Sequence, residues 1–158
     1  MGYILDRKDA GKVLANIRKD KKVVFTNGCF DIIHKGHIDY LSKAAKLGDI
    51  MVLGLNSDES ISRIKGDKRP IMPFEDRSAI LSALGFIDFV VSFEEDTPYE
   101  LIKEIVPDIL IKGKDYDAKD IVGYDIVTGN GGKVETIELT PGKSTTNIIE
   151  KILKAHED

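Results

Sequence analysis

The sequence predicts an α/β fold: a single-domain, Rossmann-like, doubly wound parallel sheet of five strands with helices on both faces. Three observations predict it. Short apolar runs alternate along the chain with segments of helical periodicity, which is the pattern of right-handed βαβ units. The run over 50–55 is apolar almost throughout, as in strands that are covered on both faces. Finally, 158 residues suit one core, and no long linker or internal repeat divides them.

Each expected element has a local signal. Val13, Leu14 and Ile17 share one helical face, Gly48 marks a helix end, and Pro73 stands at a helix start. The strands are short runs rich in β-branched residues, bounded by turn-forming residues. The chain 1–158 is therefore expected to be one domain, with an N-terminal helix within 1–20 and a Rossmann-like core over 21–153. In chain order, we expect a helix over 8–19, a strand over 23–26, a helix over 36–47, a strand over 50–55, helices over 57–64 and 73–84, a strand over 86–92, a helix over 97–106, a strand over 108–112, a helix over 118–129, a strand over 134–139 and a helix over 144–155.

Composition excludes several classes of protein. The net charge is -4, and the Lys and Arg residues are spread along the chain, which disfavours nucleic acid as a partner. The single cysteine, Cys29, permits neither an internal disulfide nor a cysteine-rich zinc site. No apolar run approaches the roughly 20 residues that cross a bilayer, and the N-terminus lacks the apolar core of a signal peptide. We therefore expect a cytoplasmic protein without a membrane partner.

The stretch TNGCFDIIHKGH over 26–37 carries the strongest chemical signal. His34 and His37 are three residues apart at an expected helix start, so they share a face. Free N–H groups and partial positive charge make a helix N-terminus favourable for phosphate, and Gly36 allows a phosphate to approach the backbone closely. Two imidazoles there are suited to donate hydrogen bonds as negative charge develops. The alternatives are ordinary surface histidines or half of a metal site, for which only Asp31 and Cys29 are nearby ligands.

This stretch resembles the His-x-Gly-His signature of the nucleotidyltransferase superfamily, which includes cytidylyltransferases, adenylyltransferases and class I aminoacyl-tRNA synthetases. Its longer form over 25–31 is most similar to the adenylyltransferases that make ADP-heptose. The resemblance covers roughly residues 10–153 and implies a homodimer. Heptose adenylyltransferases are often fused to a sugar kinase, so the resemblance implies a stand-alone form here. Further similar stretches lie at 56–58, 69–71, 75–77, 95–98, 112–116 and 141–146.

The resemblance also implies roles for individual residues. His34, His37 and Lys65 are expected to be catalytic, with Lys65 reaching the α-phosphate, whereas Arg63 and Arg69 are expected to hold the sugar phosphate. The residues expected to bind the nucleotide are Thr26, Asn27, Gly28, Cys29, Phe30, Gly36, Lys112, Gly113, Asp115, Ser144, Thr145 and Thr146.

Several of these residues have a simpler structural interpretation. The loop that carries Lys65 is also consistent with a solvated basic loop, Asp115 with a turn former and Ser144 with a helix N-cap. A Walker A loop ending at Ser144 is excluded, because Ile137 stands where its first glycine is required. Residues 75–77 (Glu-Asp-Arg) are expected to form a structural ion network on their helix.

Two lysines depart from the family pattern. Lys114 stands where many relatives have a second glycine. Lys143 stands where heptose enzymes often have arginine, which keeps the charge but loses the bidentate fork.

The expected reaction is transfer of AMP from ATP to a sugar 1-phosphate, D-glycero-D-manno-heptose 1-phosphate, giving ADP-heptose and pyrophosphate. A phosphate monoester has its second pKa at about 6 and is already largely a dianion, so no general base is required. Mg²⁺ is expected to arrive on the triphosphate, with no metal site of the protein's own. Four other functions remain open: cytidylyl transfer to glycerol 3-phosphate or phosphoethanolamine, a GTP-using heptose 1-phosphate guanylyltransferase, a flavin-forming adenylyltransferase, and a non-catalytic nucleotide-binding regulatory module.

Two sequence features rank these alternatives. Thr140 and Pro141 stand where glycerol-phosphate cytidylyltransferases place an arginine, which counts against cytidylyl transfer. The intact histidine pair and Lys65 count against a regulatory module, because a sensor has no need of groups that stabilise a transition state.

Overall fold

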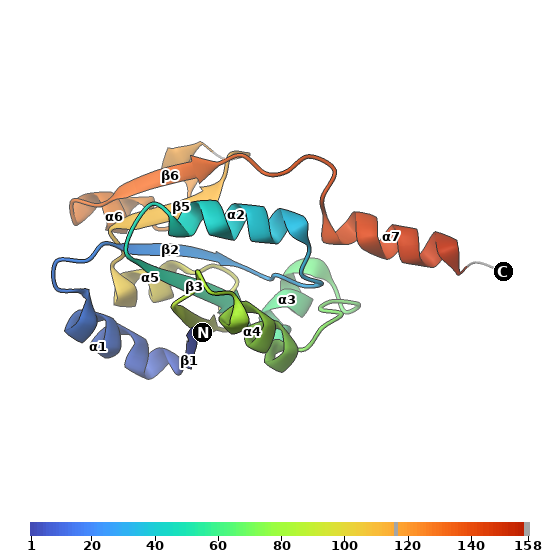
Figure 1. Cartoon of the computed structure of the whole chain (residues 1–158), viewed down its shortest axis with the longest axis horizontal. Coiled ribbons are helices and arrows are strands. Elements are labelled where there is room, and N and C mark those ends of the chain that lie inside the picture. The colour runs from blue at the N-terminus through green and yellow to red at the C-terminus, as the bar shows by residue number, and fades with distance from the viewer. Residues whose placement is uncertain (116, 157–158) are drawn as a thin grey trace.

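The computed structural model describes residues 1–115 and 117–156, and it has the predicted doubly wound α/β architecture (Figure 1). All strand pairs in the sheet are parallel, in the order β1-β4-β3-β2-β5-β6. The strands are β1 (Tyr3–Leu5), β2 (Val23–Gly28), β3 (Ile50–Asn56), β4 (Phe89–Phe93), β5 (Ile109–Gly113) and β6 (Lys133–Ile137). The helices are α1 (Arg7–Arg18), α2 (Lys35–Ala45), α3 (Asp58–Lys65), α4 (Phe74–Ala83), α5 (Tyr99–Ile105), the 3₁₀ turn η1 (Ala118–Asp120), α6 (Tyr124–Gly129) and α7 (Thr145–Ala155).

The predicted number of five strands is wrong, because the sheet has a sixth strand, β1, at its edge. This strand has only three residues, and Tyr3 and Ile4 are exposed, so the sequence carries no alternating pattern there. It forms because the edge of β4 offers unpaired backbone groups: the Tyr3 amide donates to the Asp88 carbonyl at 2.8 Å. The Tyr3 ring also stacks on Phe89, with the ring centroids 6.1 Å apart. Residues 1–20 therefore contain a strand and then a helix.

One predicted helix is broken in the structure. The segment 118–129 forms η1 and then α6, separated by a turn in which Gly123 has a φ of 91°. That left-handed conformation suits glycine and interrupts helical geometry. A side chain at this position would also press on Ile102 of α5, at 2.6 Å.

The two faces of the sheet bury separate apolar cores. On one face, Phe25 and Leu110 pack with residues of α1, α5 and α6. On the other, Val24 and Ile111 pack with residues of α2 and α4. Successive residues of a strand point to opposite faces, so this alternation fixes the side of the sheet on which each later residue of β2 and β5 lies.

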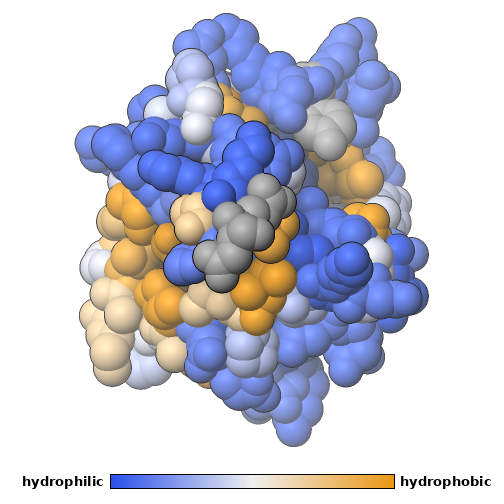
Figure 2. Space-filling view, turned by 90° about the vertical axis from the view of Figure 1, so that its right-hand side faces the viewer, coloured by the Kyte–Doolittle hydropathy of each residue, from blue (hydrophilic) through white to orange (hydrophobic). Residues whose placement is uncertain are grey.

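The last helix, α7, projects from the body of the fold (Figure 1). None of its residues is buried, and Ile152 and Leu153 are among the exposed large apolar residues. Figure 2 faces this end of the molecule and shows apolar surface gathered beside hydrophilic surface. Within the described residues, no helix combines the length and the apolar character needed to cross a membrane.

Candidate active site

A cavity of about 640 Å³ lies at the carboxyl ends of β2 and β5. The order of the strands reverses between these two neighbours, and ligands of doubly wound sheets bind in the crevice at such a point. The cavity brings together most of the residues singled out from the sequence. Those that line it are Asn27, Gly28, Cys29, Phe30, His34, Gly36, His37, Lys65, Arg69, Lys112, Gly113, Asp115, Ser144, Thr145 and Thr146.

Two residues expected at the site do not line this cavity. The Thr26 side chain is buried, where its hydroxyl bonds the Ile111 carbonyl at 2.9 Å and the Tyr40 hydroxyl at 2.8 Å, so it ties β2 to β5 and α2. Arg63 is exposed and bonds Asp96 at 2.9 Å. Arg63 precedes Lys65 by two residues, or about 200° around a helix, so the two side chains diverge. The placement of Arg63 is at odds with the expectation that it holds the sugar phosphate.

The two histidines of the motif form a stacked pair at the start of α2. Their ring centroids are 3.8 Å apart and their planes differ by 25°. His34 is the N-cap of α2, and its Nδ1 accepts a hydrogen bond from the Gly36 amide at 3.1 Å. An accepting Nδ1 places the proton of a neutral His34 on Nε2, which leaves an N–H donor on the other side of the ring. The Phe30 ring meets His37 edge-on, at 5.2 Å between centroids.

Burial keeps both imidazoles neutral at physiological pH. Together with the smaller effect of the neighbouring His34, it lowers the pKa of His37 to about 4. Burial also lowers the pKa of His34, together with the charge of Lys143. The pair therefore supplies neutral N–H donors, and the positive charge of the site comes from its lysines, its arginine and the helix N-termini.

We expect the His37 imidazole to stay neutral when the pH is lowered from 8 to 5, because its pKa lies near 4. Protonation would place a charge in a desolvated position beside His34. In NMR spectra, the Cε1–H chemical shift of His37 should stay constant over this range and move only as the pH approaches 4. The signal is assigned by its loss in His37→Gln. A titration centred near the ordinary histidine value, about 6.5, would contradict the burial of this ring.

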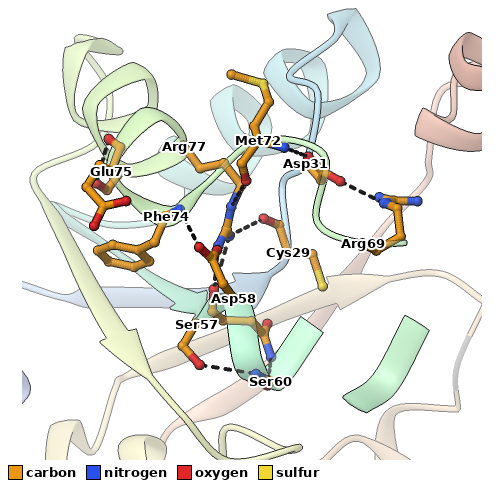
Figure 3. Close-up of polar contacts among 12 residues, drawn as sticks. Cys29, Asp31, Ser57, Asp58, Ser60, Arg69, Met72, Phe74, Glu75 and Arg77 are labelled. Carbon is orange, nitrogen blue, oxygen red and sulfur yellow. Dashed lines mark hydrogen bonds and ion pairs between the residues drawn. The ribbon is translucent and has the colours of Figure 1, made fainter. Parts of the chain in front are cut away.

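Asp31 organises the loop between β2 and α2, a role that the sequence did not reveal. Its buried carboxylate accepts hydrogen bonds from the Ile71 amide at 2.8 Å, the Met72 amide at 2.9 Å and Arg69 Nε at 2.7 Å (Figure 3). Burial by itself raises the pKa of Asp31, but these hydrogen bonds outweigh it and leave the pKa below its ordinary value. With its oxygens engaged in this way, Asp31 serves as an anchor for the loop of Arg69.

Both neighbours of Asp31 have strained backbones. Phe30 has a φ of 46° and Ile32 a φ of 52°, a region that residues other than glycine adopt rarely. The hydrogen bonds of the carboxylate hold this conformation in place, and strain of this kind clusters at functional sites. The only available sequence signal was a charged residue inside the motif, without any indication of its partners.

Arg77 connects the strand ends beneath the site. Its fully buried guanidinium pairs with Asp58 at 2.6 Å and donates to the carbonyls of Cys29 at 2.7 Å and Asn56 at 3.0 Å (Figure 3). The sequence predicted an ion network among residues 75–77, but the ion-pair partner of Arg77 comes from α3. The sequence missed this partner because it lies nineteen residues away.

The N-terminus of α7 closes the cavity over the histidines. Thr145 donates its hydroxyl proton to the Asp31 carbonyl at 2.7 Å, and Ser144 caps α7 by accepting from the Asn147 amide at 3.1 Å. Ser144 thus caps the helix and lines the cavity at once. Lys143, noted in the sequence only as a departure, also lines the cavity. A Cβ at Gly36 would lie 2.9 Å from the Cβ of Lys143, so the absence of a side chain at Gly36 lets α7 approach α2.

The residues around the cavity are suited to bind phosphate groups. They offer two neutral imidazoles, the N-termini of α2 and α7, the hydroxyls of Ser144, Thr145 and Thr146, and several cationic side chains. Within 1–115 and 117–156, no group of three or more His, Cys, Asp and Glu side chains is arranged to hold a metal ion.

Residues 25–151 match the family described as cytidylyltransferase-like. The chain belongs to this family. It is a nucleotidyltransferase, as the resemblance of its motif implied. Among similar proteins, the bifunctional protein HldE of Syntrophotalea carbinolica is 58% identical over 140 residues, which cover 89% of this chain and 29% of HldE. The bifunctional protein HldE of Geobacter sulfurreducens is 54% identical over 147 residues, which cover 93% of this chain and 30% of HldE. The chain thus spans about 30% of the length of these relatives.

Two solved structures have a similar fold to this nucleotidyltransferase. The crystal structure of the lipopolysaccharide core biosynthesis protein from Thermoplasma volcanium GSS1 is 31% identical, with a TM-score of 0.62, and the match covers 76% of this chain and 97% of that one. Pantoate-beta-alanine ligase from Francisella tularensis has a TM-score of 0.63 over 100% of this chain and 80% of its own, at 15% identity. The second likeness is one of fold alone.

Proposed function

We propose that this nucleotidyltransferase transfers AMP from ATP to D-glycero-D-manno-heptose 1-phosphate, giving ADP-heptose and pyrophosphate. The observation that carries the reaction type is the neutral histidine pair at the start of α2, which lines one cavity together with the N-terminus of α7. The choice of heptose and ATP rests on the resemblance of residues 25–31 to heptose adenylyltransferases. The similarity to HldE and to a lipopolysaccharide core biosynthesis protein supports that choice.

In the proposed reaction, an oxygen of the sugar phosphate attacks the α-phosphorus of ATP. A new P–O bond forms, the bond from the α-phosphorus to the bridging β-oxygen breaks, and pyrophosphate leaves with that electron pair. The nucleophile arrives as a dianion, so no proton has to be removed from it. The remaining task is to bring two anions together in line and to stabilise the charge that develops.

The residues around the cavity divide this task. The imidazoles of His34 and His37 donate hydrogen bonds to the phosphates, and the N-termini of α2 and α7 supply amides and partial positive charge. Lys65 and Arg69 also line the cavity and supply positive charge. Asp31 holds Arg69 in place by accepting a hydrogen bond from its Nε. Mg²⁺ bound to the triphosphate would neutralise further charge, held by phosphate oxygens.

The test is a matrix of ATP, CTP, GTP and UTP against heptose 1-phosphate, glycerol 3-phosphate, phosphoethanolamine and flavin mononucleotide, read by pyrophosphate release. We expect the highest kcat/KM for ATP with heptose 1-phosphate, and ADP-heptose as the product by mass spectrometry. Reactions without an acceptor, and reactions with a His34→Ala/His37→Ala double variant, measure the background. A preference for CTP or GTP would overturn the choice of base, and no release with any pair would support a regulatory module.

A further inference from the structure

The cavity has two sides, one above each face of the sheet, and Asn27 lies on the α5 side. Phe25 packs in the core with α1 and α5, and Asn27 follows it by two residues on the same strand. A Cβ at Gly54 would lie 3.2 Å from both the Cβ of Asn27 and the Cδ2 of Leu101 in α5. The Asn27 side chain therefore lies on the face of the sheet opposite the one that α2 covers.

Lys112 lies on the same side of the sheet as Asn27. Leu110 belongs to the core with α5, and Lys112 follows it by two residues on β5. The register places Phe25 directly beside Leu110, and side chains alternate along each strand, so Asn27 and Lys112 lie on the same face of the sheet. Asn27 and Lys112 both line the cavity. They face it from the α5 side, whereas the histidines face it from the side of α2.

Neither side chain is satisfied by the part of the protein that the structure describes. The Lys112 ammonium forms no hydrogen bond or ion pair with the described residues, and Asn27 Oδ1 is buried without a hydrogen-bond partner among them. Burial lowers the pKa of Lys112 to about 8, so its ammonium is still largely charged at pH 7. A half-buried cation and a buried amide oxygen without partners are costly unless a ligand binds them.

The in-line geometry of phosphoryl transfer indicates which ligand binds on the α5 side of the cavity. The attacking and leaving oxygens lie on opposite sides of the α-phosphorus. The histidines and the N-terminus of α7 provide the groups for the departing pyrophosphate, and they lie on the α2 side. The nucleophile must then approach from the α5 side, where Lys112, Asn27 and Asp120 border the cavity. One ammonium suits a phosphate monoester, and carboxamide and carboxylate oxygens accept hydrogen bonds from sugar hydroxyls.

We propose that the α5 side of the cavity is the subsite for the acceptor, a polyhydroxylated sugar phosphate, with Lys112 binding its phosphate and Asn27 and Asp120 binding its hydroxyls. The proposal rests on the proposed function and deepens it. It moves Asn27 and Lys112 from nucleotide binding to acceptor binding. Lys112 would add a second cation for the acceptor phosphate in addition to Arg69, which was expected in this role and also lines the cavity, whereas Arg63 does not line it.

The test compares Lys112→Met with Lys114→Met. Lys114→Met is the matched control because it removes the same charge two residues away. Lys114 is exposed, pairs with Glu138 and does not line the cavity. For Lys112→Met, we expect the KM for the sugar phosphate to rise about tenfold or more, as for the loss of one charge-assisted hydrogen bond. The Kd for ATP, measured by calorimetry without an acceptor, should stay within about twofold of the wild type. Lys112→Arg should recover part of the loss.

Two further measurements keep the outcome decisive. Asn27→Ala should also raise the KM for the acceptor while leaving the Kd for ATP unchanged, and it carries the test if Lys112→Met does not fold. The acceptor in every assay is the sugar phosphate that the wild-type enzyme uses best. If heptose 1-phosphate is the wrong substrate, the wild-type enzyme itself will show it, and the comparison of the variants is unaffected. A weakened Kd for ATP with an unchanged KM for the acceptor would overturn the proposal and return both residues to the nucleotide.

Discussion

Replacing His37 with alanine is expected to lower kcat by about 10²–10³-fold, the range for removing one donor that stabilises developing charge. The reason is geometric, since His37 stacks on His34 at 3.8 Å and is fixed by the edge of Phe30. The variant loses the N–H donor of His37 and also the ring on which the His34 imidazole stacks. The effect should fall on kcat more than on the Kd for ATP, because charge builds up only during transfer.

The control for this prediction is His156→Ala, which removes the exposed histidine that follows α7 and does not line the cavity. Its kcat should match the wild type in the pyrophosphate-release assay. His34→Ala should impair kcat similarly and also cost about 1 kcal/mol of stability, because His34 is the N-cap of α2. Wild-type kcat in His37→Ala would remove the pair from the mechanism.

Replacing Arg77 with alanine is expected to lower the free energy of unfolding by about 3–5 kcal/mol, because it leaves a large cavity and removes the donor to buried backbone carbonyls. Arg77 is fully buried, and its loss leaves Asp58 and the carbonyls of Cys29 and Asn56 without their donor. These groups lie at the ends of β2 and β3 and at the start of α3, so activity should fall along with stability.

Arg63→Ala is the matched control, because Arg63 is an exposed arginine in an exposed ion pair with Asp96. Such pairs contribute about 0–1 kcal/mol, so this variant should unfold at nearly the denaturant concentration of the wild type. Both variants are compared by chemical denaturation followed by circular dichroism. Equal midpoints for Arg77→Ala and Arg63→Ala would show that the buried network contributes little.

The fold class followed from local patterns because each pattern is carried by adjacent residues. The apolar run of β3 and the alternation of strands with helices were sufficient for a doubly wound sheet. The edge strand β1 was missed because its three residues are held by the backbone of β4, and their side chains carry no signal. Likewise, the break between η1 and α6 depends on the close packing of Gly123 against Ile102.

In the candidate site too, the features that the sequence predicted are formed by residues adjacent in the chain, and those that it missed are formed by distant residues. The sequence by itself determined the motif over 26–37, because its histidines and glycine are neighbours in the chain and a helix start orients them. Only the tertiary structure decided the partners of Asp31 and Arg77, since Met72 lies forty-one positions from Asp31, and Asp58 and Cys29 lie nineteen and forty-eight positions from Arg77. It also decided that Arg63 pairs with Asp96 without lining the cavity and that Asn27 and Lys112 share a face. Those properties depend on the pairing of strands and the docking of helices, which bring distant residues together and which no local pattern encodes.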